Sequence, residues 1–439
     1  MTRVLWLVGR LPTVLAGTVG QPAVSRGGWQ DALLERIAVE PGIELSVAYP
    51  GPNPGERNHL GGVDFYCVGP IEPSGQLDRV LSRWSPNRLN TGILREIRRT
   101  VDASRPDVVH AHGAESGFGL AAAGSGVPLV VSVQGVLTVY QMVAPETTES
   151  ASLKYAASVL RGISPWHARR RFAAAAATEK RIMGMCDVVA GRTEFDRRIA
   201  AILAPQADYV RVGEVLRQPF YDAAGSWVLS SSDGRPTICM TGGSYSRKGI
   251  DTALLAVAAL RDAGTDVRLR IIGSGLESAT GRAALLDAQT LRIEDRIVLL
   301  DETDAVGVVA ELLGCDMYVH PSRADNSPNS LCEAMMVGVP CIASWVGGVS
   351  SLATDHLEAL LVPPGDAYSL AGAMLDMLAD SDVASELGRN ARKRAAVRHN
   401  PDAVVAQLMD AYRAALSTKD SADGQPDLIS TWSGAGDSR

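Results

Sequence analysis

Residues 320–348, HPSRADNSPNSLCEAMMVGVPCIASWVGG, decide the fold. A β-branched run ends at the start of this stretch, a polar loop follows, and an apolar helical pattern begins near Asn329. A helix N-terminus after a strand offers free backbone amides to an anion. Asp325 and Glu333 flank that N-terminus, and carboxylates accept hydrogen bonds from sugar or ribose hydroxyls. The stretch predicts a phosphate site between two carboxylates. The plain structural alternative is a loop cap at Asp325 and a surface ion pair at Glu333.

Short apolar runs separated by helix-length stretches continue on both sides of this segment. They read as buried parallel strands at 4–8, 45–48, 108–110, 129–133, 188–190 and 209–212, then at 238–241, 269–272, 297–300, 317–320, 341–343 and 360–362. Alternating strands and helices indicate βαβ units. We therefore expect an α/β protein with two doubly wound, Rossmann-like domains that face each other across a cleft. Ligands of such sheets bind beyond the carboxyl ends of the strands.

The length of 439 residues exceeds one ordinary core, which agrees with two domains. We place the first domain at 1–212 and the second at 213–400, with the polar stretch 230–236 in the connection. A helix at 401–416 is expected to return to the first domain. Residues 417–439 are rich in Ser, Asp and Gly and predict a disordered tail.

Charge and cysteine usage restrict the class of protein further. The formal net charge of −7 argues against a nucleic-acid partner. None of the six cysteines forms a C-x-x-C pair, so we expect buried free thiols and a reducing, cytoplasmic location. No run of about 18 apolar residues occurs, so we expect no membrane span.

The 320–348 stretch resembles the E-x7-E signature of family 4 glycosyltransferases, which have the GT-B fold. The matching residues are Pro321, Ser322, Pro328, Asn329, Glu333, Ala334, Met335, Gly338, Pro340, Ala343, Ser344, Gly347 and Gly348. The first acid of the signature is Asp325 here instead of Glu. The resemblance implies that Glu333 binds the donor ribose, that Asp325 binds the donor sugar, and that amides at Asn329, Ser330 and Leu331 hold the diphosphate.

A second stretch, TGGSYSRKG at 241–249, resembles the Gly-Arg…Lys-Gly loop of the same family. Lys248 matches, whereas Gly243 stands where the family has Arg; Arg247, next to Lys248, is the candidate for the second cation. Fixed cations suit this place, because the leaving diphosphate gains negative charge in the transition state. Gly273 resembles the family's glycine turn near the nucleotide base. The Asp-x-Asp at 380–382 we interpret as a helix cap and not as a metal site.

The first domain resembles the family less closely. Gly27 and Gly28 precede a helix and match the family's glycine pair against the donor phosphate and sugar. His110 and His112 end a strand and point the same way, as two ligands of a zinc ion would, but no third ligand is evident. The resemblance places His112 at the reaction centre and Gln134 and Gly135 on the acceptor side. Gln134 replaces a family His, so this position cannot titrate.

The resemblance as a whole implies a retaining glycosyltransferase that moves a sugar from a nucleoside-diphosphate sugar to an acceptor hydroxyl. Its catalytic residues are His112, Lys248 and Asp325, and it needs no metal or other cofactor. The acceptor is a glycan, a lipid-linked molecule or a small molecule. Two alternatives stay open: a sugar-nucleotide hydrolase or epimerase on the same fold, and a catalytically degenerate binding protein.

A basic stretch at 164–181 has three interpretations. Its Trp, Arg and Lys residues surround an Ala-rich core. It is a solvated helix, a peripheral contact with the inner face of a membrane, or a binding site for an anionic acceptor.

Overall fold

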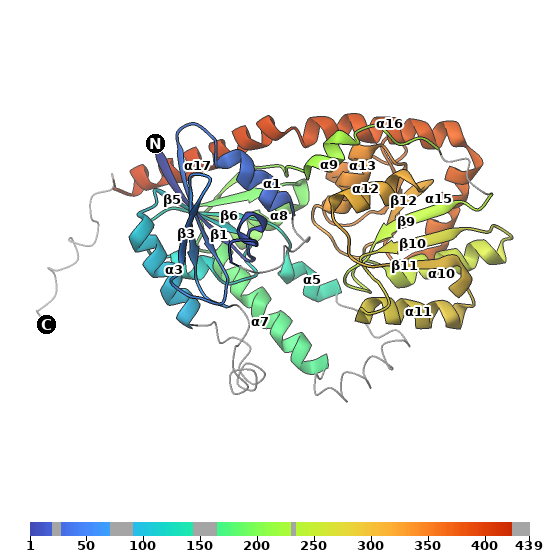
Figure 1. The fold of residues 1–439 in the computed structure, drawn as a ribbon, viewed down its shortest axis with the longest axis horizontal. Coiled ribbons are helices and arrows are strands. Elements are labelled where there is room, and N and C mark those ends of the chain that lie inside the picture. The colour runs from blue at the N-terminus through green and yellow to red at the C-terminus, as the bar shows by residue number, and fades with distance from the viewer. Residues whose placement is uncertain (20–27, 71–90, 144–164, 230–233, 424–439) are drawn as a thin grey trace, which may run out of the picture.

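The strands form two separate sheets in the computed structural model, which describes residues 1–19, 28–70, 91–143, 165–229 and 234–423. The first sheet has the order β3-β4-β2-β1-β5-β6-β7-β8, and the second has the order β11-β10-β9-β12-β13-β14. All pairs are parallel except β3 with β4. The expected α/β architecture of two parallel-sheet domains is confirmed (Figure 1).

The elements around the first sheet run from the N-terminus to the start of the connection. They are β1 (Thr2–Val8), a 3-10 turn (Thr13–Leu15), α1 (Gly28–Ile37), β2 (Ile43–Tyr49), β3 (Arg57–Leu60), β4 (Val63–Cys67), α3 (Thr91–Ser104), β5 (Val108–His112), α4 (Gly119–Ala122), β6 (Leu129–Ser132), α5 (Leu137–Val143), α7 (Pro165–Met183), β7 (Val188–Gly191), α8 (Glu194–Leu203) and β8 (Asp208–Arg211). Strands β3 and β4 are not among the predicted strands: β3 is a mostly exposed edge strand of polar residues, and β4 is a short strand in which buried and partly exposed residues alternate.

Alternation along β1 explains the layers on each side of this sheet. Val4, Trp6 and Val8 face a core that includes α1, and Leu5 and Leu7 face a core that includes α3 and α7. Successive side chains of a strand point to opposite faces, so an all-apolar strand needs cover on both. Trp29, Leu33 and Ile37 recur at four-residue steps and form the buried face of α1.

The second sheet is built in the same way. Its elements are α9 (Gln218–Asp222), β9 (Thr237–Thr241), α10 (Ile250–Asp262), β10 (Arg268–Ile272), α11 (Ala279–Leu291), a 3-10 turn (Glu294–Arg296), β11 (Ile297–Leu300), α12 (Ala305–Leu313), β12 (Met317–His320), α13 (Asn329–Val337), β13 (Cys341–Ser344), α14 (Val349–Leu352), β14 (Leu360–Val362), α15 (Ala367–Ala379) and α16 (Ser381–Arg398). The last helix, α17 (Pro401–Asp423), returns to the first domain. One core contains α10, α11 and α15, and the other contains α9, α12 and α13.

The last two helices connect the domains. α16 packs against α13, whereas α17 packs against β5 to β8 and α1, and the two helices run along both domains (Figure 1). The apolar face of α17 is buried in the first core through Val404, Leu408, Ala411, Tyr412 and Ala415. The predicted start of a disordered tail at Ser417 is wrong, because α17 continues to Asp423. Residues 424–439 lie outside the described residues.

The structure confirms two smaller predictions. All six cysteines are buried and free, as expected. Asp380 caps α16 by accepting hydrogen bonds from the amides of Asp382 and Val383, so the helix-cap interpretation is confirmed. None of the helices in the described residues is long and apolar enough to cross a membrane.

Candidate active site

The loop after β12 brings Asp325 together with the cations of the loop after β9. Lys248 Nζ donates to Asp325 Oδ2 over 2.6 Å, and Arg247 Nη1 lies 3.5 Å from the same oxygen. His320, the last residue of β12, has its Nε2 atom 3.4 Å away. β9 and β12 are neighbouring parallel strands, so their carboxyl ends meet at one edge of the sheet. Three of the predicted donor-site residues, Arg247, Lys248 and Asp325, therefore form one cluster.

The charges around Asp325 decide its ionisation. Burial by itself raises the pKa of this carboxyl, but Lys248, His320 and Arg247 hold the pKa well below its usual range. Burial also lowers the pKa of His320, although Asp325 opposes that shift. Asp325 is therefore a carboxylate at neutral pH, with no role as a proton donor.

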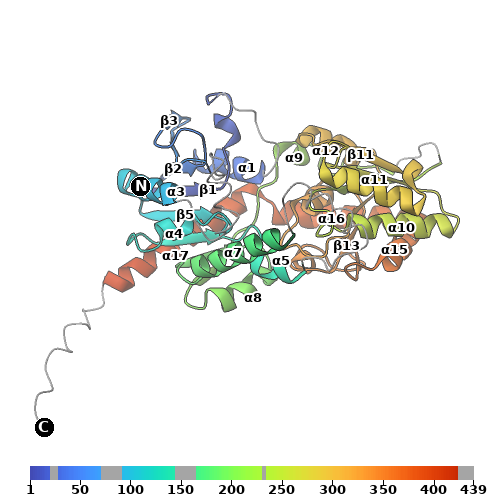
Figure 2. The same ribbon diagram turned by 90° about the horizontal axis from the view of Figure 1, so that it is seen from below.

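Residues of the first domain form hydrogen bonds with the loop that carries Asp325. Asn326 donates through Nδ2 to Asp196 Oδ1 over 3.3 Å and accepts through Oδ1 from the Tyr140 hydroxyl at 3.3 Å. Ser327 Oγ donates to Glu214 Oε1 over 2.8 Å. Tyr140 comes from α5, which both views place on the side of the first domain that faces the second (Figure 1, Figure 2). The position of Asp325 thus depends on both domains.

The N-terminus of α13 differs in detail from the prediction. Pro328 is the N-cap, with no side-chain cap hydrogen bond, and α13 begins at Asn329. The Leu331 amide already donates to the Pro328 carbonyl at 3.0 Å, which removes it from the predicted anion-binding amides. In the described part of the chain, the amides of Asn329 and Ser330 have no acceptor, and Asn329 Oδ1 is buried without a partner.

Glu333 has an ion-pair partner that the sequence analysis missed. Arg217 donates from Nε and Nη2 to Glu333 Oε1 over 3.1 and 2.8 Å. Burial raises the pKa of Glu333 to about 6, although Arg217 lowers it. The residue is therefore an ion-paired, largely buried carboxylate near neutral pH, with Oε2 not engaged by Arg217.

Two glycines shape the loop after β9. Gly249 has a φ of +69°, and a Cβ there would lie 1.9 Å from the Pro321 carbonyl oxygen. Only glycine lets the two loops approach so closely. Gly243, at the position of the family's Arg, has a φ of +129°, which strains any L-residue. Gly273 directly follows β10 in a turn, with a φ of +79°.

His110 and His112 have different environments although they share a strand face. His110 bonds through Nδ1 to the Tyr412 hydroxyl (2.9 Å) and through Nε2 to Ser132 Oγ (2.7 Å), so neither nitrogen is available to a metal. Within the described residues, both ring nitrogens of His112 are buried without a partner. Burial, His110 and nearby arginines lower the pKa of His112, so the ring is neutral. A neutral, unpartnered imidazole suits a polar ligand.

The predicted acceptor-side residues Gln134 and Gly135 lie in the loop after β6, and Gln134 Nε2 is buried without a partner among the residues described. A Cβ at Gly135 would lie 3.1 Å from the Tyr140 ring and 3.5 Å from Glu115 Oε1. Burial raises the pKa of Glu115 to about 7. Nothing in the sequence singles out Glu115 or Tyr140, because each is an ordinary residue for a loop or a helix.

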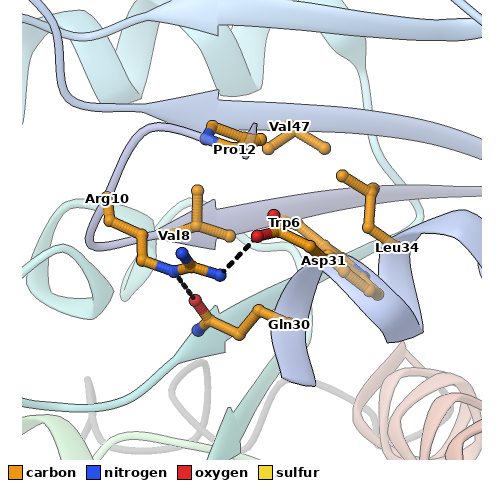
Figure 3. A pocket seen from close by; sticks show the side chains of 8 residues that line it. All are labelled: Trp6, Val8, Arg10, Pro12, Gln30, Asp31, Leu34 and Val47. Carbon is orange, nitrogen blue, oxygen red and sulfur yellow. Dashed lines mark hydrogen bonds and ion pairs between the residues drawn. The ribbon is translucent and has the colours of Figure 1, made fainter. Parts of the chain in front are cut away.

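A small hollow lies beside β1 and α1 in the first domain (Figure 3). Arg10 lines it and donates to Gln30 Oε1 at 3.0 Å and to Asp31 Oδ2 at 2.9 Å. Both partners are on α1, so Arg10 ties the loop after β1 to the start of that helix. Gly28, the predicted donor-binding glycine, is the first residue of α1. Gly27 lies outside the described residues.

A buried polar cluster, Glu214, Cys332 and His399, lies where the two domains and α16 meet. Its ligand-type atoms lie within 4.8 Å of one another. Arg192 and Arg398 face the same carboxylate and, with His399, hold the pKa of Glu214 at about 2 although burial raises it. Two arginines beside the cluster already supply positive charge, which disfavours a cation there. We interpret the cluster as part of the contact between domains.

The basic helix α7 spans Pro165–Met183. Arg169, Arg170, Lys180 and Arg181 are exposed, while Ala174, Ala176 and Glu179 are buried. Glu179 accepts hydrogen bonds from the amides of Leu137 and Thr138 at 2.9 and 2.7 Å, which fixes the start of α5. α7 therefore has one solvent-exposed basic face and one buried face. Through Glu179 it fixes the start of α5, which directly follows the loop that carries Gln134.

Solved structures define the class of this fold. Sucrose-phosphate synthase from Thermosynechococcus elongatus aligns with a TM-score of 0.71 at 18% identity, covering 95% of this chain and 100% of that one. Anabaena HepE in complex with UDP-glucose aligns with a TM-score of 0.62 at 15% identity, covering 93% and 99%. The two parallel-sheet domains have the GT-B fold of these structures.

Sequence comparisons give the family. A model described as Glycosyl transferases group 1 matches residues 226–394, and a model of a glycosyl transferase 4-like domain matches residues 33–212. This chain belongs to the group 1, family 4-type glycosyltransferases.

Curated relatives match part of the chain. D-inositol 3-phosphate glycosyltransferase from Nocardia farcinica is 28% identical over 54% of this chain and 55% of its own length. N-acetyl-alpha-D-glucosaminyl L-malate synthase from Bacillus anthracis is 30% identical over 34% of this chain and 37% of its own. The chain therefore matches about a third to a half of the length of these two relatives.

Proposed function

We propose that this protein is a retaining glycosyltransferase that transfers a sugar from a nucleoside-diphosphate sugar to an acceptor hydroxyl. The single observation that carries the proposal is the Lys248–Asp325 pair next to the N-terminus of α13. It combines a cation and free amides for a diphosphate with a carboxylate for sugar hydroxyls. HepE, solved with UDP-glucose, has the same fold.

In this proposal the donor lies mainly on the second domain. Lys248, Arg247 and the amides of Asn329 and Ser330 bind the diphosphate. Glu333 accepts hydrogen bonds from the ribose, and Asp325 accepts them from the donor sugar. Gly273 leaves room for the nucleotide base, and Gly27 and Gly28 approach the donor from the first domain. Positive charge on the protein stabilises the leaving diphosphate, so the proposal requires no metal or other cofactor.

The acceptor enters from the first domain beside His112, Gln134 and Gly135. The buried, unpartnered nitrogens of His112 and Gln134 support a polar occupant at this place. Relatives are named for acceptors as different as 2-deoxystreptamine and phosphatidyl-myo-inositol. We propose an acceptor that is a glycan, a lipid-linked molecule or a small molecule, with the exposed basic residues of α7 as the contact for an anionic acceptor or a membrane surface.

The chemical step proceeds on one face of the donor sugar. The bond from the anomeric carbon to the diphosphate oxygen breaks, and the acceptor oxygen bonds to the same carbon on the same face. The acceptor proton passes to the departing phosphate oxygen. The neutral state of His112 suits a hydrogen bond to a donor or acceptor hydroxyl instead of proton removal.

Product analysis by NMR tests this function. Thermal-shift measurements with a panel of nucleotide sugars first identify the donor, because a bound ligand raises the melting temperature. The product is expected to keep the anomeric configuration of the donor, and an inverted product would contradict the mechanism. Turnover without any acceptor would favour a hydrolase or epimerase. Donor binding without turnover across acceptors would favour a degenerate binding protein.

A further inference from the structure

Arg217 connects the two halves of the proposed donor site. It lies in the segment between the sheets and precedes α9. Its guanidinium contacts Glu333 of α13 through Nε and Nη2. Its aliphatic part runs beside the first turn of α1, since a Cβ at Gly28 would lie 2.4 Å from Arg217 Cδ. One side chain therefore lies between the two positions where the ribose and the donor phosphate are proposed.

The neighbours of Arg217 fix its guanidinium in place. Phe220 lies under it, with the guanidinium carbon 4.9 Å from the ring centroid. Both contacts with Glu333 go to Oε1, so Oε2 stays available to ribose hydroxyls. Nη1 has no acceptor in the described parts of the chain. The side chain of Arg217 is 21% exposed, so the free nitrogen belongs to a partly desolvated cation.

The rest of the site is short of positive charge. Gly243 has no side chain where the family has Arg. Lys248 is paired with Asp325, and Arg247 lies over the Tyr140 ring at 5.4 Å. A nucleoside diphosphate carries two or three negative charges. Lys248, which is paired with Asp325, and Arg247, which lies over Tyr140, neutralise only part of this charge.

We propose that Arg217 is a phosphate-binding arginine of the nucleoside-diphosphate site and supplies, from between the domains, the cation that Gly243 lacks. The inference rests on the proposed function. With the nucleotide bound, Arg217 keeps Glu333 oriented through Oε1 and donates from Nη1 to a phosphate oxygen. The planar guanidinium is suited to this double task, and a lysine at the same place is not.

Calorimetric titration with a panel of nucleoside diphosphates, and with inorganic pyrophosphate as a probe that lacks ribose, tests the inference. Arg217→Gln is expected to weaken the nucleoside diphosphate that binds the wild type by about 10- to 100-fold, and to weaken pyrophosphate as well. Glu333→Gln is expected to weaken the nucleotide and to leave pyrophosphate binding unchanged. Arg217→Lys should restore only part of the affinity.

Arg394→Gln is the matched control. Arg394 also pairs with a buried glutamate, Glu358, at 3.2 Å, and its other hydrogen bond goes to the Ser351 carbonyl and not to a proposed donor-site residue. This variant should bind like the wild type, and melting curves of every variant show whether it is folded. If Arg217→Gln loses nucleotide affinity but keeps pyrophosphate affinity, Arg217 only positions Glu333 and the inference is wrong. If the folded wild type binds none of the probes, the proposed function itself fails.

Discussion

Lys248 donates to Asp325 over 2.6 Å, so the cation proposed for the diphosphate and the carboxylate proposed for the donor sugar neutralise each other. Both side chains are largely buried, at 15% and 8% exposure. A buried pair left with one member costs more than the pair itself contributes. The donor must therefore replace part of this contact with its own phosphate and hydroxyl groups.

Replacing Lys248 by Ala should lower kcat/KM about 100-fold or more, the scale seen when one fixed donor to a developing negative charge is removed. Steady-state transfer assays with the identified donor measure it. Lys393→Ala, at an exposed position of α16, is the control and should keep wild-type rates. Near-normal turnover of Lys248→Ala would place the diphosphate site elsewhere.

Replacing Asp325 by Glu should change the choice of donor sugar. The extra methylene pushes the carboxylate toward Lys248 in a loop that both domains hold, so the native donor is expected to lose about 10-fold in kcat/KM. Competition between sugars of the same nucleotide measures the preference. Asp376→Asn, at an exposed site of α15, serves as control. An unchanged preference with an unchanged rate would remove Asp325 from the sugar subsite.

Replacing Glu115 by Gln should stabilise the protein at alkaline pH. The pKa of Glu115 is raised from 4.5 to about 7 by burial. Below pH 4.5 Glu115 is protonated in both the folded and the unfolded protein, so it does not change the free energy of unfolding. As pH rises from 4.5 through about 7, the unfolded chain gives up this proton more readily than the folded chain, and stability is lost. The advantage of the variant should therefore grow between pH 5 and pH 8, up to about 3 kcal/mol.

Urea unfolding at several pH values measures this difference. Glu386→Gln, at an exposed position of α16, is the matched control and should show no such trend. An advantage of Glu115→Gln that is equal at pH 5 and pH 8 would mean that the carboxyl does not titrate in this range.

Replacing Tyr412 by Phe should destabilise the fold by roughly 1 to 3 kcal/mol. The Tyr412 hydroxyl accepts from Trp6 Nε1 at 2.8 Å and bonds to His110 Nδ1 at 2.9 Å, so its loss leaves two buried nitrogens unpaired. Denaturant unfolding measures the free energy. Tyr368→Phe, on a side chain that is 81% exposed, should have no effect. Equal stability of the two variants would show that the Tyr412 hydroxyl does not contribute to the stability of the fold.

Much of the architecture could be predicted because local patterns carry it. Apolar runs such as 4–8 and 188–190 became interior strands, since a strand buried on both faces has few polar residues. β3 was missed because an exposed polar edge strand has no such pattern. The end of α17 was placed too early, since Ser and Asp residues after 417 read as a tail although they continue the helix.

The sequence by itself determined the two parallel-sheet domains and the family, and it selected Lys248, Asp325 and Glu333 as candidate donor-site residues. These follow from periodicity and from residues close together in the chain. Only the tertiary structure decided which groups meet: Arg217 with Glu333, Tyr140 with Asn326, and Tyr412 with Trp6. Each of these pairs is far apart in sequence, and a short-range charge or hydroxyl interaction exists only after the sheets and helices have packed.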